Sequence, residues 1–375
     1  MQFTLEHLNR YHLKAHFLIE KANPEDLVGV VSKICGLNAQ SAKAPYISLW
    51  NRISNFKRSE LFKVQYKEKL LIKSWFMRGT VHIIPMNEFP VYCNALRSFL
   101  IERLNRYILR SGLEFRKHEK RELEQNIIDS LKREPLTMRE LSIENGDLLE
   151  GYSKKEQKII LKREIFKLSH LGLICNERPT GPWYHFKENR FTTVENWLNG
   201  SKLNSIDERE AREKLLIKYF HGYGPARIHD FAYWSGLKVN ESKDILKRVQ
   251  DKLEKIKIKD CEGNFWIPRE DIDALVNIDS REELPIHFLP EFDSYLMGHK
   301  DKTHFLDEKY KKKVFLPLAD LAPVILQNGR VTGTWNYRFK DNSLTISNFY
   351  KFDKDTNEKI EFKANKLKQF IETEE

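Results

Sequence analysis

The sequence is poor in cysteine, and the few cysteines it has are far apart. Cys35, Cys93, Cys175 and Cys261 are the four present in 375 residues, and no two of them are close in sequence. This spacing excludes a disulfide framework and the paired cysteines of a zinc ribbon. We therefore expect a chain that is kept reduced, as in the cytoplasm.

Long hydrophobic runs are also missing. No apolar stretch approaches the roughly 18 residues that a membrane-spanning helix needs. The first 21 residues, MQFTLEHLNRYHLKAHFLIEK, carry charges throughout and lack the apolar centre of a signal peptide. We expect no membrane partner and a cytoplasmic location, in association with the nucleoid.

Positive charge and apolar residues are what the sequence does have. Hydrophobic residues make up 41% of the chain, and 64 Lys and Arg against 54 Asp and Glu give a net charge of +10. At roughly 150 residues per domain, this length predicts two to three domains with real cores. The basic balance favours a polyanionic partner.

One pattern occurs three times: two short helices, a longer helix and a strand hairpin, which is the order of a winged helix. The second copy is the clearest, with a helix over 120–134, a Thr137–Glu140 capping box and a longer helix from Ser153. Its hairpin, LICNERPTGPWYHFK, turns around Pro179, Gly181 and Pro182. The third copy runs from about residue 206, and its hairpin turns at Glu262-Gly263. The first copy is more diverged, with a hairpin that turns near Arg78-Gly79.

From about residue 284 the sequence alternates in the manner of strands. It turns at Asn328-Gly329 and Asp341-Asn342, which predicts a small β-barrel, and a final helix begins near Asn357. The predicted fold class is α+β, with three tandem winged helices followed by the barrel. The predicted domains are 1–118, 119–200, 201–280 and 281–375. Winged helices favour double-stranded DNA as the partner, although they also serve as protein-binding modules and scaffolds.

Two amides, Asn38 and Gln40, stand just before a predicted helix in CGLNAQSAKAPYISLW. Amides neither gain nor lose protons near neutral pH, so they cannot act as acid or base. Their spacing is compatible with a helix cap or a turn. It is also compatible with two side chains that hold a water molecule.

Several segments, taken in order, resemble the winged-helix DNA glycosylases of the AlkZ and YcaQ type over nearly the whole chain. They are GLNAQ (36–40), MRGTVHIIP (77–85), YFHGYGPARIHDFAYWSGL (219–237), LPEFDSYLMGHKDK (289–302) and GRVTGTW (329–335). The family's usual motif is Gln-x-Gln or Gln-x-Asp, and here the first position is Asn38. The shorter side chain places its amide about 1.5 Å further back, roughly one C–C bond.

The resemblance implies a monofunctional DNA glycosylase that removes cationic N7- or N3-alkylated purines, including bulky adducts or crosslinks. A purine of this kind leaves without protonation, so a water held by Gln40, with Asn38 as second anchor, is sufficient for hydrolysis. We expect no cofactor and no metal, and a monomeric enzyme. Asn38 keeps open the alternative of a non-catalytic DNA-binding protein, such as a regulator or lesion sensor.

The resemblance also suggests residues that contact DNA: Arg78 and His82 on the first hairpin, and Asp293, His299 and Lys300 in the segment that enters the barrel. Without it, Arg78 and His82 read as a polar pair on a solvated face, and GHKDK as a polar turn. Tyr223 and Trp234 are expected to pack in the third winged helix rather than to stack on bases.

Overall fold

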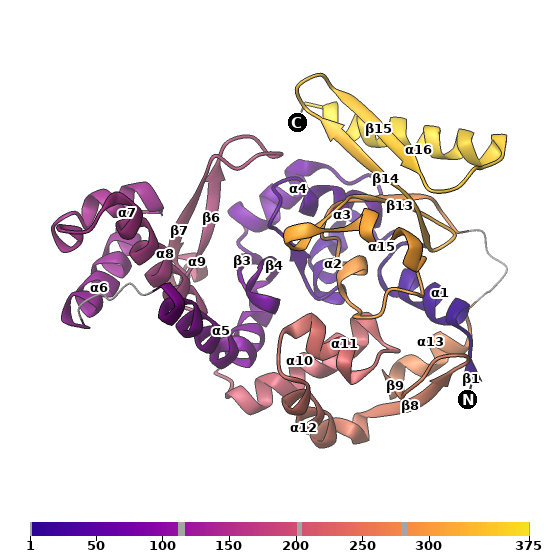
Figure 1. The fold of residues 1–375 in the computed structure, drawn as a ribbon, viewed down its shortest axis with the longest axis horizontal. Coiled ribbons are helices and arrows are strands. Elements are labelled where there is room, and N and C mark those ends of the chain that lie inside the picture. Colours follow the sequence, from indigo (N-terminus) through magenta and orange to yellow (C-terminus); the bar gives the residue numbers. More distant parts are fainter. Residues whose placement is uncertain (1, 112–116, 201–204, 279–283, 375) are drawn as a thin grey trace. The chain divides into compact units, whose positions relative to one another are not determined.

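The structure, a computed structural model, describes residues 2–111, 117–200, 205–278 and 284–374. The chain forms two compact units (Figure 1). The first unit comprises Met1–Leu61, Leu216–Trp234 and Lys238–Glu375, and the second comprises Phe62–Leu215 with Ser235–Leu237. The division into four domains stays a prediction, and its boundaries at 200/201 and 280/281 fall on residues outside this description.

The second unit contains the helices and the hairpin of the predicted second winged helix. Its elements are β3 (Leu71–Trp75), β4 (Val81–Pro85), α5 (Phe89–Ser111), α6 (Lys117–Arg133), β5 (Leu136–Thr137), α7 (Met138–Glu144), α8 (Lys154–His170), β6 (Ile174–Thr180), β7 (Glu188–Thr193) and α9 (Val194–Leu198). Within this unit the strands lie in the order β4-β3-β6-β7-β5. The first and second hairpins are thus joined edge to edge, with Lys73 of β3 opposite Asn176 of β6.

Local signals fix where the helices of this unit begin. The predicted capping box is confirmed: the Glu140 backbone N–H donates to the Thr137 hydroxyl, and the Thr137 N–H donates to the Glu140 carboxylate. Ser153 and Glu156 form the same arrangement at the start of α8. Each box satisfies two backbone donors that a helix start leaves unpaired. Buried apolar side chains from α6, α7, α8 and the hairpin then form one core.

The first unit joins the N-terminal residues to the predicted third winged helix. Its elements before residue 280 are β1 (Gln2–Phe3), α1 (Leu5–Ala15), α2 (Leu27–Lys33), β2 (Leu37–Asn38), α3 (Ala44–Arg52), α4 (Arg58–Phe62), the end of α10 (Glu208–Tyr223), α11 (Ile228–Ser235), α12 (Val239–Val249), β8 (Leu253–Ile258), β9 (Phe265–Pro268) and α13 (Ile272–Val276). β1 pairs in parallel with β8, and β8 pairs with β9 in the predicted hairpin. Tyr223 and Trp234 are buried in this unit, as expected.

The C-terminal part of the first unit holds a four-stranded sheet and a closing helix. Its elements are β10 (His287–Leu289), α14 (Ser294–Met297), α15 (Lys311–Val314), β11 (Phe315–Leu316), β12 (Asp320–Leu321), β13 (Val324–Gln327), β14 (Arg330–Arg338), β15 (Ser343–Asn348) and α16 (Lys354–Glu372). Asn328 and Gly329 both adopt positive φ between β13 and β14, as a two-residue hairpin turn requires.

The predicted closed barrel is not found among the described strands. The sheet order β10-β13-β14-β15 leaves β10 and β15 as edges. At the β10 edge, helix α3 takes the place of a further strand, because Asn51 Nδ2 donates to the Phe288 carbonyl at 2.9 Å. An edge that a helix covers needs no partner strand, so the sheet stays open.

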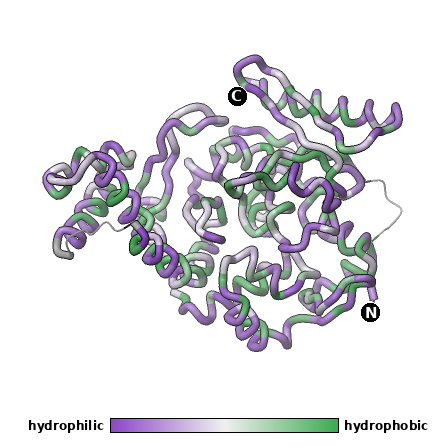
Figure 2. The backbone as a smooth tube through the Cα atoms, viewed as in Figure 1, coloured by the Kyte–Doolittle hydropathy of each residue, from purple (hydrophilic) through white to green (hydrophobic). Residues whose placement is uncertain are grey.

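The last helix illustrates how this unit buries its apolar residues. In α16 the buried positions are Ile360, Ala364, Leu367, Phe370 and Ile371, at helical spacing. Apolar and polar stretches accordingly alternate along it (Figure 2). Among the described helices, none combines the length and the apolar character needed to cross a bilayer.

Candidate active site and nucleic-acid interface

The Asn-Ala-Gln motif lies between α2 and α3, and its two amides contact each other. The Gln40 backbone N–H donates to Asn38 Oδ1 at 3.1 Å, which makes a turn two residues long. Asn38 Nδ2 donates to Gln40 Oε1, also at 3.1 Å. Asn38 is buried and Gln40 is exposed. Neither side chain caps α3, whose N-cap is Lys43, so the helix-cap interpretation is wrong.

This geometry gives the two amides different tasks. Gln40 Oε1 uses one lone pair on Asn38 and keeps a second for a donor from solvent. Asn38 has both polar atoms engaged with Gln40. The arrangement therefore presents one exposed side chain, Gln40, whose amide is held in orientation by buried Asn38, rather than two equivalent anchors.

The backbone around the motif is held by residues 291–294. Ser294 Oγ donates to the Gly36 carbonyl at 2.8 Å, before the motif. After the motif, Ser41 Oγ donates to Glu291 Oε1 at 2.6 Å, and Lys43 Nζ lies 3.1 Å from the same oxygen. The motif loop is thus fixed at both ends by one short segment. Glu291 and Ser294 were not predicted as site residues, although both lie in the LPEFDS segment that carries the family resemblance.

An open depression with a volume of about 350 Å³ lies beside Lys43 and Glu291, which line it together with residues of β11, β12, β14 and β15, among them Trp335 and Asn336. Its lining mixes an apolar ring with charged and amide groups.

Asp293 is enclosed and paired within the first unit, which argues against the expected DNA contact. Both Asp293 and Arg52 side chains are fully buried, and they form a two-pronged ion pair with distances of 2.6 and 2.9 Å. Ser48 Oγ donates to Asp293 Oδ2 at 2.8 Å. A buried carboxylate so fully paired cannot meet a phosphate, and its charge would repel one. Asp293 instead fastens α3 to the segment that clamps the motif.

His299 and Lys300 are adjacent in sequence but differ in exposure. His299 is 5% exposed, and its Nε2 donates to the Tyr223 carbonyl at 2.9 Å. Burial lowers the pKa of His299 to about 3, so the ring is neutral and offers no charge to DNA. Burial and neutrality argue against the expected DNA contact of His299, which stays a prediction. Lys300 is exposed, so the argument from burial does not apply to it.

Arg78 and His82 belong to the hairpin β3–β4 of the second unit. Arg78 lies at its tip with φ of 56°, and its carbonyl accepts from Arg103 of α5. His82 is buried and its Nδ1 donates to the Thr80 carbonyl at 2.9 Å. Burial, with a smaller effect from Arg78, lowers the pKa of His82 to about 3. A neutral, enclosed ring argues against a phosphate contact for His82, and the expected DNA contacts of His82 and Arg78 stay predictions.

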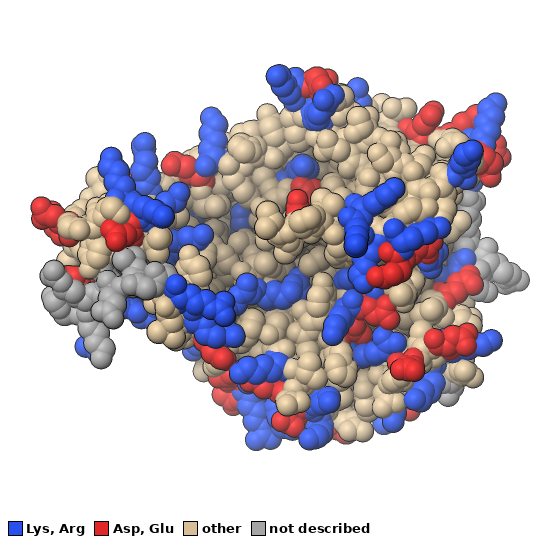
Figure 3. All heavy atoms as spheres, viewed as in Figure 1, with Lys and Arg blue, Asp and Glu red and all other residues tan. Residues whose placement is uncertain are grey.

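Two cationic helix faces on the second unit were not predicted. Exposed Lys154, Lys158 and Lys162 recur every four residues along α8. Arg103, Arg106 and Arg110 are exposed on α5 at spacings of three and four. Residues so spaced share one helix face. Lys and Arg gather visibly over this unit (Figure 3). The α8 series was recognisable from its spacing within the predicted third helix of the winged helix.

The cationic helix faces of the second unit suit a nucleic-acid-binding protein, and the motif loop of the first unit adds a pair of oriented amides. The family model described as DNA glycosylase AlkZ-like matches residues 31–370, and the chain therefore belongs to this family and is a DNA glycosylase. This membership decides against the non-catalytic alternative.

Two comparisons agree with that assignment. The chain is similar to an interstrand DNA cross-link repair glycosylase of Streptomyces sahachiroi, with 24% identity over 352 residues, covering 90% of this chain and 89% of the relative. Its fold is similar to the solved structure of Streptomyces sahachiroi DNA glycosylase AlkZ, with a TM-score of 0.79 and 20% identity. That alignment covers 99% of this chain and 97% of the other.

Proposed function

We propose that this glycosylase hydrolyses the N-glycosidic bond of cationic N7- or N3-alkylated purines in duplex DNA, using a water held by Gln40. The side chain of exposed Gln40, oriented by Asn38, carries the proposal. The name of the Streptomyces relative supports interstrand crosslinks as further substrates and a place in DNA repair, and bulky adducts are proposed beside them.

The chemistry fits an amide because the leaving group is already charged. An alkylated purine departs as a neutral base once the C1′–N bond breaks, and the sugar becomes an oxocarbenium-like cation. Water attached to Gln40 Oε1 is placed and polarised for attack at C1′, and its proton passes to solvent. Positioning of this kind contributes several kcal/mol, which is enough for a cationic base and too little for a neutral one.

Asn38 acts in this scheme as a positioning residue. Its buried amide donates to Gln40 Oε1 and accepts from the Gln40 N–H, so the catalytic amide has one preferred orientation. An Asn in place of the family's usual Gln is suited to this role, since the two-residue turn requires the shorter side chain. The Asn38 amide lies about 1.5 Å further back than a Gln amide would, and in this position it orients Gln40 rather than holding the water.

Contacts with DNA are proposed for the cationic faces of α8 and α5, for Arg78 and for Lys300. Lys and Arg spaced along a helix neutralise successive phosphates and release counterions. The three winged helices are proposed as the DNA-binding scaffold, with α8 as the recognition helix of the second. We further propose that the enzyme acts as a monomer in the cytoplasm, on nucleoid DNA.

The decisive experiment uses a duplex with a single N7-methylguanine. The protein is incubated with it, abasic sites are cleaved with alkali, and strand breaks are counted. We expect excision by the parent and a loss of about 100-fold in Gln40→Ala, with DNA affinity nearly unchanged. Equal excision by an equally folded Gln40→Ala would refute the site. No excision of any cationic purine by the parent would refute the proposed substrate class.

A further inference from the structure

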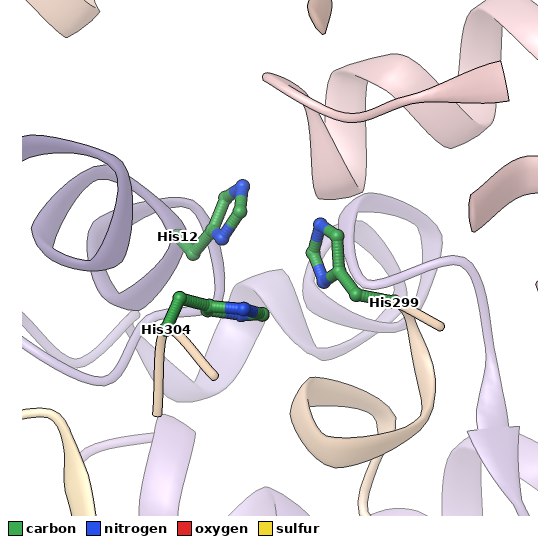
Figure 4. Close-up of side chains that lie close together, drawn as sticks. All are labelled: His12, His299 and His304. Atoms are coloured by element: carbon green, nitrogen blue, oxygen red, sulfur yellow. The ribbon is translucent and has the colours of Figure 1, made fainter. Parts of the chain in front are cut away.

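Three histidines of the first unit meet in its interior. His12 comes from α1, while His299 and His304 flank the turn after α14. One nitrogen from each ring lies within 4.8 Å of the others. The ring centres are 4.5 Å apart for His12 and His299, 4.8 Å for His299 and His304, and 5.5 Å for His12 and His304. The close-up shows the three rings arranged around a shared space (Figure 4).

Four of the six ring nitrogens in this cluster lack hydrogen-bond partners. Both nitrogens of His12, Nδ1 of His299 and Nε2 of His304 are buried without one. The Tyr223 and Pro225 carbonyls approach His12 closely enough to raise its pKa, but not in hydrogen-bonding geometry. Because His299 Nε2 donates to the Tyr223 carbonyl, its Nδ1 is the bare nitrogen and points a lone pair inward. Unsatisfied polar atoms buried in such number are rare in proteins and call for a ligand.

All three rings are in the form that binds metal. Burial lowers the pKa of His12, His299 and His304 far enough that each is neutral at pH 7, so no proton must leave before coordination. A ring held through its other nitrogen by a carbonyl, as His299 is, is the usual arrangement of a metal-bound histidine.

A small cavity beside the cluster supplies room for a further ligand. It has a volume of about 20 Å³ and is lined by His299 and His304 together with Asp230 and Asp301. This is enough for one water molecule. The two carboxylates are bound to other groups, Asp230 to the Lys300 N–H and Asp301 to Arg227, yet their negative charges raise the pKa of His12 and His299. The same field favours a cation at the centre.

We propose that His12, His299 and His304 form a binding site for a divalent transition metal, with Zn²⁺ as the preferred ion and a water from the adjacent cavity as fourth ligand. Three neutral imidazoles and one water suit Zn²⁺, which takes four ligands in a tetrahedron. Nitrogens in such a site lie about 3.4 Å apart, given Zn–N bonds of about 2.1 Å. The rings thus need to move inward by an ångström or so.

The role of this metal is structural and distinct from the amide chemistry. It links α1 to the turn after α14, and His299 carries the link to the Tyr223 carbonyl. The Tyr223 hydroxyl lies 3.1 Å from the Ile34 carbonyl and 3.2 Å from that of Ser294, both beside the motif loop. The metal therefore stiffens the frame that holds Asn38 and Gln40. Sequence inspection missed the site because its third ligand, His12, stands far from the His299–His304 pair.

The test measures metal binding by the whole protein. After chelator treatment and dialysis, the protein is titrated with Zn²⁺, and in parallel with Co²⁺, whose visible absorption distinguishes tetrahedral from octahedral sites. We expect one equivalent per chain and a tetrahedral Co²⁺ spectrum. His304→Gln should weaken binding at least about 10-fold. His287→Gln is the matched control, because His287 is equally buried in the same unit but lies outside the cluster.

A stability measurement gives a second readout that does not depend on any variant folding. At free Zn²⁺ about 100-fold above its dissociation constant, the unfolding equilibrium constant of the parent should fall about 100-fold. No bound metal in the parent, an octahedral Co²⁺ spectrum, or unchanged binding in a folded His304→Gln would each overturn the proposal. If His304→Gln does not fold, the parent titration alone decides between one equivalent and none.

Discussion

Mild acid should destabilise the first unit strongly, because this unit buries five histidines in their neutral form. Burial lowers the pKa of His287 and His299 to about 3, and that of His12, His16 and His304 well below its ordinary value. In the unfolded chain each imidazole titrates near 6.5. Between these values the unfolded state binds protons that the folded state excludes, so stability is complete above pH 6.5 and declines as the pH falls below it.

The size of the loss in unfolding free energy follows from the difference between the histidine pKa values of the folded and the unfolded chain. Between about pH 7.5 and pH 5.5, each such histidine lowers the free energy of unfolding by about 1.4 kcal/mol. His287 and His299, whose pKa is about 3, together amount to about 3 kcal/mol, and His12, His16 and His304 add to this loss in the same direction. Carboxylates contribute little in this range because their ordinary pKa values lie below it.

The assay is urea unfolding at the two pH values, with a chelator present so that no metal competes for the imidazoles. Pulsed hydrogen exchange on peptides from α1 and from 287–297 restricts the measurement to the first unit. In His287→Gln the pH difference should shrink by about 1.4 kcal/mol, whatever the variant's overall stability. His229→Gln removes an exposed imidazole and should leave it unchanged. A difference below about 2 kcal/mol in the parent, or the same difference in His287→Gln, would refute the reasoning.

Three further changes test the site and its support. Asn38→Asp keeps the acceptor for the Gln40 N–H but removes the donor to Gln40 Oε1, so excision of N7-methylguanine should fall between about 10- and 100-fold at unchanged folding; full activity would exclude the orienting role. Replacing Lys158 and Lys162 together with Gln should reduce the slope of log affinity against log salt by about 1.8, measured by DNA titration at several salt concentrations; an unchanged slope would place these residues outside the interface. In Gly298→Ala the new methyl would lie 2.1 Å from the Tyr223 ring, so urea unfolding should show a loss of about 1–3 kcal/mol, and a loss below 0.5 would mean the ring moves aside freely.

Short-range features of the fold were predictable from the sequence. The Thr137–Glu140 capping box and the Asn328-Gly329 turn depend on residues a few positions apart, and both are present. The closed barrel was not predictable, because local alternation cannot reveal that α3 covers the edge of β10. The sequence indicates where strands begin and end. Whether a sheet closes into a barrel depends on which elements pack against its edge strands.

The candidate site shows the same difference between features set by neighbouring residues and features set by distant ones. Asn38 and Gln40 were found because they are neighbours, but their division of tasks depends on hydrogen-bond geometry. The burial of Asp293 could not be predicted, because its partner, Arg52, lies in another segment. The same holds for His299, whose ring meets the Tyr223 carbonyl of a distant segment. Polar residues in a turn suggest exposure until the tertiary structure shows what surrounds them.

The parallel pairing of β1 with β8 has a consequence for how the protein is made. Because Met1–Leu61 belongs to the same unit as Lys238–Glu375, the stretch that carries Asn38 and Gln40 leaves the ribosome long before its partners exist. At about 5–20 residues per second, the remaining roughly 300 residues take some 15 to 60 s to synthesise. The intervening Phe62–Leu215 is continuous and can fold during that time. The amide pair is therefore synthesised well before the segments that hold it, and it reaches its working geometry only after the second unit has been made.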